Sequence, residues 1–282
     1  MSTIEVRKLG GVGAEIHGVD LAAGISDKEF ADIRQVFCEE GLIFFRDQSI
    51  NAAQHIAFAE RWGDINVNRF FAANEEYPQI AMVTKEPEQT ANIGGGWHTD
   101  HSYDVEPAMG SILVARELPE TGGDTLFTNM YKVFDSLSPG LQNTLLGLNA
   151  VHSAKFAFGS RSKHQKEAST IGRIGNSEAA DAMSDSVHPV VISHPLSGRK
   201  VLYVNPGFTR RFEGWSLEDS VPLLEYLYQV ARKEEFITRF NWEPGSIAFW
   251  DNRATWHLAN NDYHGQRREM HRITIEGCAL SG

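Results

Sequence analysis

Two patterns in this chain place metal-binding residue types at useful spacings. His98 and Asp100 stand two positions apart, which on an extended strand points both side chains to the same face. Near the C-terminus, the apolar segment 247–250 runs into a turn and then reaches His257, which could supply a third ligand. Two imidazoles and one carboxylate leave other positions of an octahedral ion open, which suits iron(II) that binds a chelating cosubstrate and oxygen together.

The His-x-Asp pair alone is a weak signal, because short motifs of common residues recur by chance. The same ligand set could also hold zinc with a bound water, so a zinc-dependent hydrolase is an alternative function. The chain has 11 histidines, and any one of them can be an ordinary hydrogen-bonded or solvent-facing side chain. That role is expected for His17, His55, His164 and His264.

Two arginines near the C-terminus could bind anions. Arg268 and Arg272 lie four positions apart on a run that alternates like a strand, so both would face the same side. Guanidinium groups bind carboxylates and sulfonates through paired hydrogen bonds, so a cavity that contains both would accept two anions. The alternative is that Arg267, Arg268 and Arg272 form a solvated basic patch.

Short strands with a few helices must position these residues. Periodic apolar residues predict helices at 27–40, 51–63 and 216–233, with a capping box at Asn51 and Gln54 starting the second and glycines ending the first two. Apolar runs between turn residues predict strands at 42–45, 110–115, 124–127, 187–193, 200–205 and 246–250. This pattern is typical of an antiparallel sandwich or barrel, mainly β with helical decoration.

Length and composition indicate a single domain over residues 1–282, with 41% hydrophobic and 22% charged residues. The net charge of -11 argues against a nucleic-acid partner. No apolar run reaches the roughly 20 residues of a membrane span, and the start lacks a signal-peptide core, so we expect a cytoplasmic protein without a membrane partner. Cys38 and Cys278 lie far apart and are expected to be reduced thiols.

The sequence leaves two features undecided: the role of one polar segment and the oligomeric state. Residues 160–185, rich in small and polar side chains, are predicted to form a mobile insertion, either a lid or a plain surface loop. A homo-oligomer, a dimer or tetramer, is expected. Apolar residues of the N-terminal helices could form its interface, although packing against the sheets explains them equally well.

Taken together, the chain resembles the taurine dioxygenase and aryloxyalkanoate dioxygenase family of 2-oxoglutarate-dependent oxygenases, over nearly its whole length. The matching segments, in order, are 13–16, 18–21, 41–48, 97–100, 122–125, 250–253 and 266–272. The resemblance implies a double-stranded β-helix, or jelly roll. It also implies an enzyme that uses iron(II), 2-oxoglutarate and O2 to hydroxylate a small anionic substrate, with 2-oxoglutarate converted to succinate and CO2.

Carried over position by position, the resemblance implies roles for five residues around the metal. The iron ligands fall on His98, Asp100 and His257, and the contacts to the distal carboxylate of 2-oxoglutarate fall on Thr125 and Arg268. It implies no catalytic residue beyond this metal centre.

The resemblance also implies a substrate pocket. Arg272 matches the residue that binds the substrate anion, and Phe208, Phe158 and His101 match positions beside the substrate. For both phenylalanines, core packing is the competing role. Gly94 stands where taurine enzymes have an Asn near the substrate, which argues against taurine itself.

The substrate class is therefore predicted broadly. Residues 151–160 resemble the aryloxyalkanoate branch, so the candidates are an aryloxyalkanoate-like carboxylate and an alkyl sulfonate or sulfate. A catalytically inactive jelly-roll binding protein is the non-enzymatic alternative, and the complete set of site residues argues against it.

Overall fold

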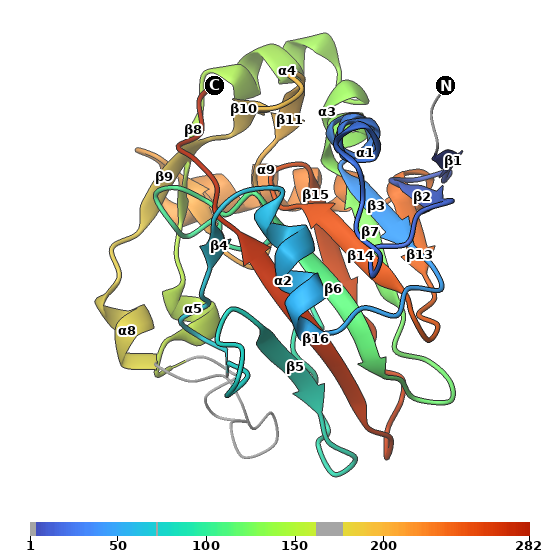
Figure 1. Ribbon diagram of the computed structural model, residues 1–282. Helices are drawn as coiled ribbons and strands as arrows, with labels where there is room; N and C mark the ends of the chain where they lie inside the picture. Colours follow the sequence, from blue (N-terminus) through green and yellow to red (C-terminus); the bar gives the residue numbers. More distant parts are fainter. Residues whose placement is uncertain (1–3, 72, 162–176) are drawn as a thin grey trace.

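The computed structural model describes residues 4–71, 73–161 and 177–282. Its main sheet runs in the order β1-β2-β3-β14-β6-β16-β4, and β5 pairs with β16 beside this path (Figure 1). Strands β2 and β3 are parallel, and the other pairs are antiparallel. The strands are β1 Glu5–Lys8, β2 Ala14–His17, β3 Leu42–Phe45, β4 Ile65–Asn66, β5 Ala81–Lys85, β6 Gly110–Glu117, β14 Ile247–Asp251 and β16 Arg268–Ile275.

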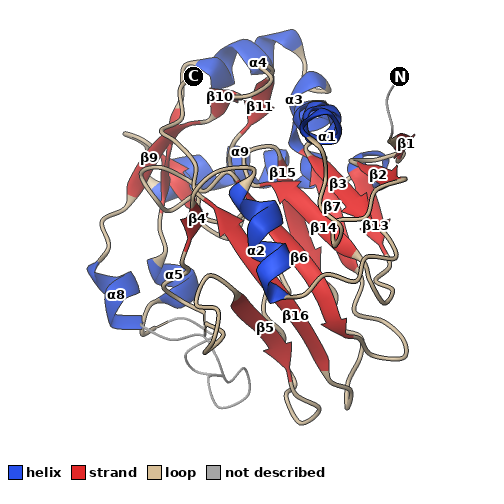
Figure 2. Cartoon of the chain, viewed as in Figure 1, coloured by secondary structure: helices blue, strands red, loops and turns tan. Residues whose placement is uncertain are grey.

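Smaller sheets complete the β-structure (Figure 2). The sheet β13-β7-β15 packs against the main sheet, and the sheets β12-β8-β9 and β10-β11 lie beyond it. Their strands are β7 Thr125–Asn129, β8 Asn149–His152, β9 Ser186–Pro189, β10 Val191–Ser193, β11 Lys200–Leu202, β12 Thr209–Phe212, β13 Ile237–Phe240 and β15 Thr255–Ala259. The prediction of a mainly β fold with helical decoration is confirmed.

The first two helices begin at capping boxes, of which the sequence predicted the one at Asn51. In α1 (Asp27–Glu40) the Ser26 hydroxyl accepts a hydrogen bond from the Glu29 amide, and the Glu29 carboxylate accepts one from the Ser26 amide. In α2 (Ala52–Glu60) Asn51 and Gln54 exchange the same pair of bonds. The second helix ends at Glu60, short of the predicted end at 63, because a tighter turn follows in which the Trp62 amide donates to the Ala59 carbonyl. This turn packs the Trp62 side chain against Phe37 of α1.

The remaining helices are short, apart from α9, which begins after Ser216, where the predicted helix starts, and is capped by that side chain. They are α3 Met130–Asp135, α4 Pro139–Leu146, α5 Lys155–Phe158, α8 Ser177–Ala182, α9 Leu217–Ala231 and the 3-10 turn Glu234–Phe236. The predicted strand 187–193 is two strands, β9 and β10, which pair with different partners. Of the predicted insertion, residues 162–176 lie outside the described residues, and 177–182 are helical.

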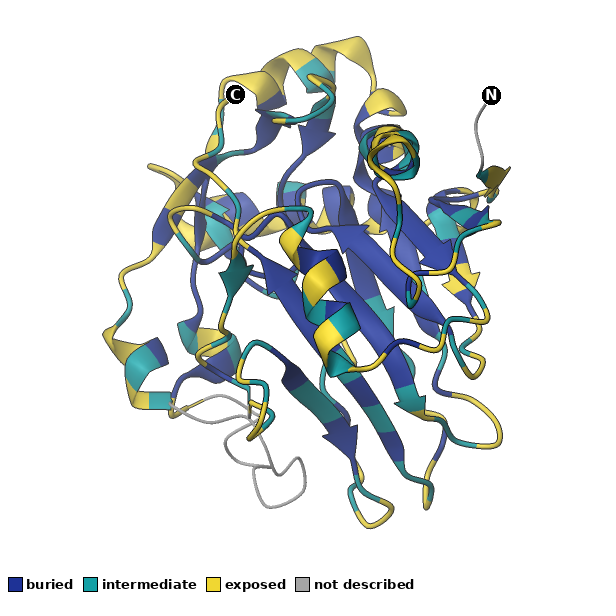
Figure 3. Cartoon of the chain, viewed as in Figure 1, coloured by how far each residue is buried: buried dark blue, intermediate teal, exposed yellow. Residues whose placement is uncertain are grey.

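Strand β3 shows how the core is built. All four of its residues are fully buried, because the strand is covered on both faces (Figure 3). Phe44 faces the smaller sheet and packs on Phe127 and Phe240. Phe45 faces the opposite side and packs on Phe58 of α2. Because its side chains alternate between the two faces of the sheet, this one short strand contributes to two separate core layers.

Strands from both ends of the sequence, β1 and β16, belong to the same main sheet. This supports the single-domain prediction, which stays a prediction. Within the described parts of the chain, no helix is both long and apolar enough to cross a membrane.

Candidate metal centre and its pocket

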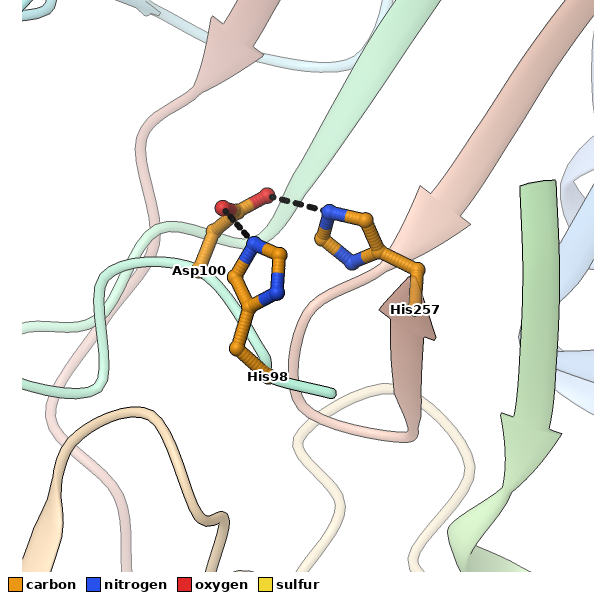
Figure 4. Close-up of side chains that lie close together, drawn as sticks. All are labelled: His98, Asp100 and His257. Atoms are coloured by element: carbon orange, nitrogen blue, oxygen red, sulfur yellow. Dashed lines mark ion pairs between the residues drawn. The ribbon is translucent and has the colours of Figure 1, made fainter. Parts of the chain in front are cut away.

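His98, Asp100 and His257 point toward one another (Figure 4). His98 Nε2 lies 3.6 Å from Asp100 Oδ1, and His257 Nε2 lies 3.8 Å from Asp100 Oδ2. One candidate ligand atom from each residue lies within 4.8 Å of the others. Two atoms that bind one ion through bonds of about 2.1 Å lie at most about 4.2 Å apart, and both His–Asp separations are within this limit. The donor set and its spacing therefore fit an iron(II) ion, as the pattern predicted.

A backbone bridge brings the third ligand to the first two. The His98 amide donates to the His257 carbonyl at 3.1 Å, and the His257 amide donates to the His98 carbonyl at 2.8 Å. Residues 98–100 are otherwise loop, so the expected strand is a single bridge on the edge of β15. Residues directly opposite in such a bridge place their side chains on the same side, and this pairing is what aligns the two imidazoles.

Thr99 lies between the two ligands, is buried, and donates its hydroxyl hydrogen to the Asn252 carbonyl. Asn252 belongs to the turn after β14, which a buried ion pair stabilises. The Asp251 carboxylate accepts hydrogen bonds from Arg253 Nε and Nη2 at 2.9 and 2.7 Å and from His194 Nε2 at 2.9 Å. Burial opposes ionisation of Asp251, but Arg253 and His194 outweigh it and lower the pKa of this carboxyl. The turn is therefore a rigid support for the ligand loop.

In both histidines, Nε2 is the ring nitrogen that faces Asp100. His98 Nδ1 lies 2.7 Å from the Gly96 carbonyl and must carry the hydrogen there, because a carbonyl only accepts. In the tautomer with its hydrogen on Nδ1, Nε2 carries the lone pair and faces Asp100. Burial, followed by the nearby His98, lowers the pKa of His257 well below its usual value, so this ring is neutral and able to coordinate.

Asp100 is held in its charged form. Arg272 Nη2 lies 2.9 Å from Asp100 Oδ2, and Ser111 donates to the same oxygen at 3.4 Å. Burial opposes ionisation, but Arg272 and the two histidines outweigh it and keep the pKa of Asp100 well below its usual range. The Arg272 contact is an ion pair without hydrogen-bond alignment, so Nε and Nη2 of Arg272 remain without hydrogen-bond partners among the described residues.

Arg268 and Arg272 both face the cavity, as their spacing predicted. They are only 5% and 6% exposed, so the solvated-patch alternative is wrong for them. Arg267 alone lies nearer the surface, where it pairs with three glutamates. Burial lowers the pKa of Arg268, and its Nε and Nη2 have no hydrogen-bond partner among the described residues. A buried cation without a counterion is costly, and a ligand carboxylate would relieve that cost.

One cavity of about 730 Å³ collects every predicted site residue. They are His98, Asp100, His101, Thr125, Phe158, Phe208, His257, Arg268 and Arg272. Phe158 and Phe208 also pack with Phe70 and Tyr103 in a buried cluster, so pocket lining and core packing coexist at both positions.

His101 has a left-handed backbone with φ 58°, which is uncommon outside glycine. Its Nδ1 lies 2.8 Å from Asp104 Oδ2, and its Nε2 lies 3.3 Å from Asn68 Nδ2. The carboxylate can only accept, so Nδ1 carries the hydrogen and Nε2 accepts from Asn68. The ring is thereby held at the rim of the cavity beside Asp100.

Several lining residues were missed by sequence reasoning: Asn68, Phe71, Asn92, Tyr103 and Trp250. Trp250 could have been found, since it ends the predicted strand before the turn that leads to His257. Asn68 and Phe71 come from the loop after β4, which carries no motif, so only the folded chain places them at the site.

Comparisons with known proteins identify a matching family and several relatives. A family model described as taurine catabolism dioxygenase TauD, TfdA family matches residues 5–274. An alkylsulfatase of Acinetobacter baylyi is 32% identical, over 99% of this chain and 87% of the relative. A 2,4-dichlorophenoxyacetate dioxygenase of Cupriavidus pinatubonensis, described as α-ketoglutarate-dependent, is 31% identical over 93% of each chain.

A solved structure of a taurine dioxygenase from Burkholderia xenovorans matches with a TM-score of 0.83 and 33% identity. It covers 99% of this chain and 93% of its own. The jelly-roll prediction is confirmed by this likeness.

Proposed function

Because the chain belongs to the taurine catabolism dioxygenase TauD, TfdA family, we propose that His98, Asp100 and His257 hold its iron(II) and that Arg268 and Thr125 bind its 2-oxoglutarate. The protein is a 2-oxoglutarate-dependent dioxygenase acting on small anionic substrates, with iron(II) and O2 as its other requirements. The observation that carries the residue assignment is that one cavity holds the three ligands and two buried guanidiniums that lack hydrogen-bond partners at Nε and Nη2.

The residues of the chain have separate tasks. The iron, together with 2-oxoglutarate and O2, supplies the oxidising power that hydroxylates a carbon–hydrogen bond, with succinate and CO2 as coproducts. Arg268 and Thr125 anchor the far carboxylate of 2-oxoglutarate, and Arg272 binds the substrate anion close to Asp100. The position of that anion decides which carbon lies nearest the metal, so Arg272 controls the site of reaction.

We propose an aryloxyalkanoate-like carboxylate or an alkyl sulfonate or sulfate as the substrate. Relatives described as an alkylsulfatase and a 2,4-dichlorophenoxyacetate dioxygenase support these classes. The aromatic wall of Phe71, Phe158 and Phe208 supports an apolar substrate body. Gly94 also lines the cavity, and with φ 82° and His98 Cε1 3.4 Å from the position of a Cβ, it lies directly beside this metal-ligand candidate.

The test uses protein purified without oxygen. Iron(II) and 2-oxoglutarate are added, the visible spectrum is recorded, and anionic candidates are screened for succinate release. A weak charge-transfer band and succinate formation stimulated by one substrate class would support the proposal. Tight zinc binding without any band would instead favour the zinc hydrolase that the ligand set alone allows.

We also propose a homo-oligomer, a dimer or tetramer, located in the cytoplasm. Two exposed apolar side chains one turn apart on α9, Leu217 and Val221, support a subunit interface. The free thiols Cys38 and Cys278 support a reducing compartment. Analytical ultracentrifugation measures the first property, and fractionation of cells measures the second.

A further inference from the structure

We propose that Trp242 is a positioning residue for 2-oxoglutarate, because its indole N–H obliges the Thr125 hydroxyl to donate its hydrogen toward the cosubstrate. The inference rests on the proposed function, in which Thr125 and Arg268 contact the far carboxylate of 2-oxoglutarate. Trp242 itself does not line the cavity and acts through these two neighbours.

The direction of one hydrogen bond carries the argument. Trp242 Nε1 lies 2.9 Å from Thr125 Oγ1. An indole nitrogen only donates, so the hydroxyl oxygen must accept, and its single hydrogen is left free for another acceptor. Thr125 is 3% exposed and lines the cavity, and no acceptor within the described residues takes that hydrogen. A carboxylate oxygen in the cavity is the partner that would satisfy it.

The same indole also supports the second carboxylate contact. The guanidinium carbon of Arg268 lies over the Trp242 ring, 5.7 Å from its centre. Phe240 packs edge-on against that ring at 4.9 Å and limits its movement. Gly123 packs directly beside the Arg268 side chain. Its φ is 74°, and a Cβ there would lie 3.4 Å from Cδ and Nε of Arg268. One aromatic side chain therefore holds both groups that face the carboxylate.

Without the indole N–H, the Thr125 hydroxyl is free to point its lone pairs at the carboxylate, which is repulsive, or to bond elsewhere. Binding of 2-oxoglutarate then has to fix one orientation of the Thr125 hydroxyl, and this cost weakens its affinity. Binding of the substrate anion at Arg272 does not pass through this contact and stays unchanged.

The experiment is a double-mutant cycle on the manganese-loaded protein, with the dissociation constant of 2-oxoglutarate measured by calorimetry. The variants are Trp242→Phe, which keeps an aromatic ring over Phe240 but removes the N–H, Thr125→Val, and the double variant. We expect Trp242→Phe to weaken binding about tenfold, the effect of one hydrogen bond to a charged group. In the double variant, loss of the N–H should add no further weakening to that of Thr125→Val.

Trp215→Phe is the matched control, because this tryptophan is 37% exposed and lies outside the cavity. In turnover by the iron enzyme, Trp242→Phe should raise KM for 2-oxoglutarate about tenfold and leave kcat within about twofold, since the contact stabilises the bound cosubstrate equally in the ground state and in the transition state. A residue that merely stabilises the fold would not produce this separation of KM from kcat.

Unchanged binding in Trp242→Phe, or additive losses in the double variant, would overturn the inference. A wild-type protein that does not bind 2-oxoglutarate would instead refute the proposed function on which it rests. If Trp242→Phe does not fold, hydrogen exchange of the Trp242 indole N–H is measured in the folded proteins. Protection in the wild type that is lost in Thr125→Val supports the contact, and equal exchange in both overturns it.

Discussion

At the residue scale, Arg268 and Arg272 have nearly equal burial but different surroundings. Arg272 already faces the Asp100 carboxylate at 2.9 Å, so it is electrostatically linked to the metal centre. Arg268 forms no ion pair within 4.0 Å among the described residues, and its neighbours are Trp242 and Gly123. The two arginines should therefore differ in which ligand depends on each of them.

Replacing each arginine by alanine tests this difference. Arg272→Ala should weaken substrate binding roughly thirtyfold or more and leave 2-oxoglutarate binding nearly unchanged, because removing a buried charge contact costs several kcal/mol at one site only. Arg268→Ala should do the reverse. Calorimetric titration of the substrate and of 2-oxoglutarate into each variant measures both dissociation constants, with Arg267→Ala as the surface control. Equal losses of both ligands in one variant would mean that the roles are misassigned.

His55 is a correction to the sequence analysis, which expected a hydrogen-bonded or solvent-facing side chain. It is fully buried in α2, so it does not face solvent, and neither ring nitrogen has a well-aligned hydrogen-bond partner among the described residues, its contact with the Ile112 backbone being weak. Burial, then the charges of Arg116 and His271, lowers the pKa of His55 from 6.5 to about 3. Its place on the buried side of an amphipathic helix was decided by packing, which one sequence does not reveal.

A pH dependence of stability follows from His55. Its folded-state pKa is depressed, so the stability linked to the neutral ring is present above the unfolded pKa of 6.5 and is lost as pH falls toward 3. At pH 5 the loss is about 2 kcal/mol. His55→Leu should remove this part of the acid sensitivity. Urea denaturation of metal-free protein at pH 7.5 and pH 5 measures it, with exposed His264→Leu as the control. An unaltered pH slope in His55→Leu would contradict the assignment.

At the element scale, the turn after β14 and the loop before β6 form one unit. The ligand loop has little regular structure of its own, and it is held by the bridge from His98 to β15 and by the Thr99 hydroxyl on Asn252. The buried Asp251–Arg253 pair gives the turn its rigidity. Ligand geometry therefore depends on residues that never contact the metal.

Thr99→Val tests this support, because it keeps the shape of the side chain and removes the hydroxyl. We expect metal affinity to fall roughly tenfold, within the range seen when groups behind metal ligands are removed. Thr99→Ser keeps the hydroxyl and should recover most of the affinity. Cobalt(II) titration followed by visible absorption gives both the dissociation constant and the ligand geometry. Identical cobalt(II) dissociation constants and spectra in Thr99→Val and in the wild type would show that the hydrogen bond from Thr99 to Asn252 does not position the metal ligands.

At the scale of the whole molecule, the metal site lies between two packed sheets. β16 contributes the two arginines, β15 contributes His257, and β7 contributes Thr125, so ligand and metal would bridge both sheets. The cavity that they share contains two buried guanidiniums: Arg272 pairs with Asp100, whereas burial of Arg268 is not offset by an ion pair within 4.0 Å among the described residues.

Ligand binding should therefore stabilise the whole fold. Saturation of manganese(II)-loaded protein with 2-oxoglutarate at about 100 times its Kd should add about 2.7 kcal/mol, which raises Tm by roughly 5 °C in a chain of this size. Differential scanning calorimetry measures the shift. Arg268→Ala should lose the increment due to 2-oxoglutarate and keep the increment due to manganese. A variant that kept both would show that Arg268 does not bind this ligand.

Local patterns were sufficient to determine some features of this protein. The capping box of α2 and the Gly41 end of α1 were predicted from sequence, because these signals lie within a few residues of the helix that they bound and need no tertiary partner. The His-x-Asp pair and the spacing of Arg268 and Arg272 were predicted for the same reason, since neighbouring residues share one short segment.

Only the tertiary structure decided what joins distant segments. It placed His257 opposite His98, brought Asn68 and Phe71 to the cavity, turned Arg268 inward while Arg267 stayed outside, and put the Trp242 N–H on Thr125. It also divided the predicted strand 187–193 between two sheets. The physical reason is that strand partners and burial depend on contacts between residues far apart in the chain, which periodicity within one segment does not encode.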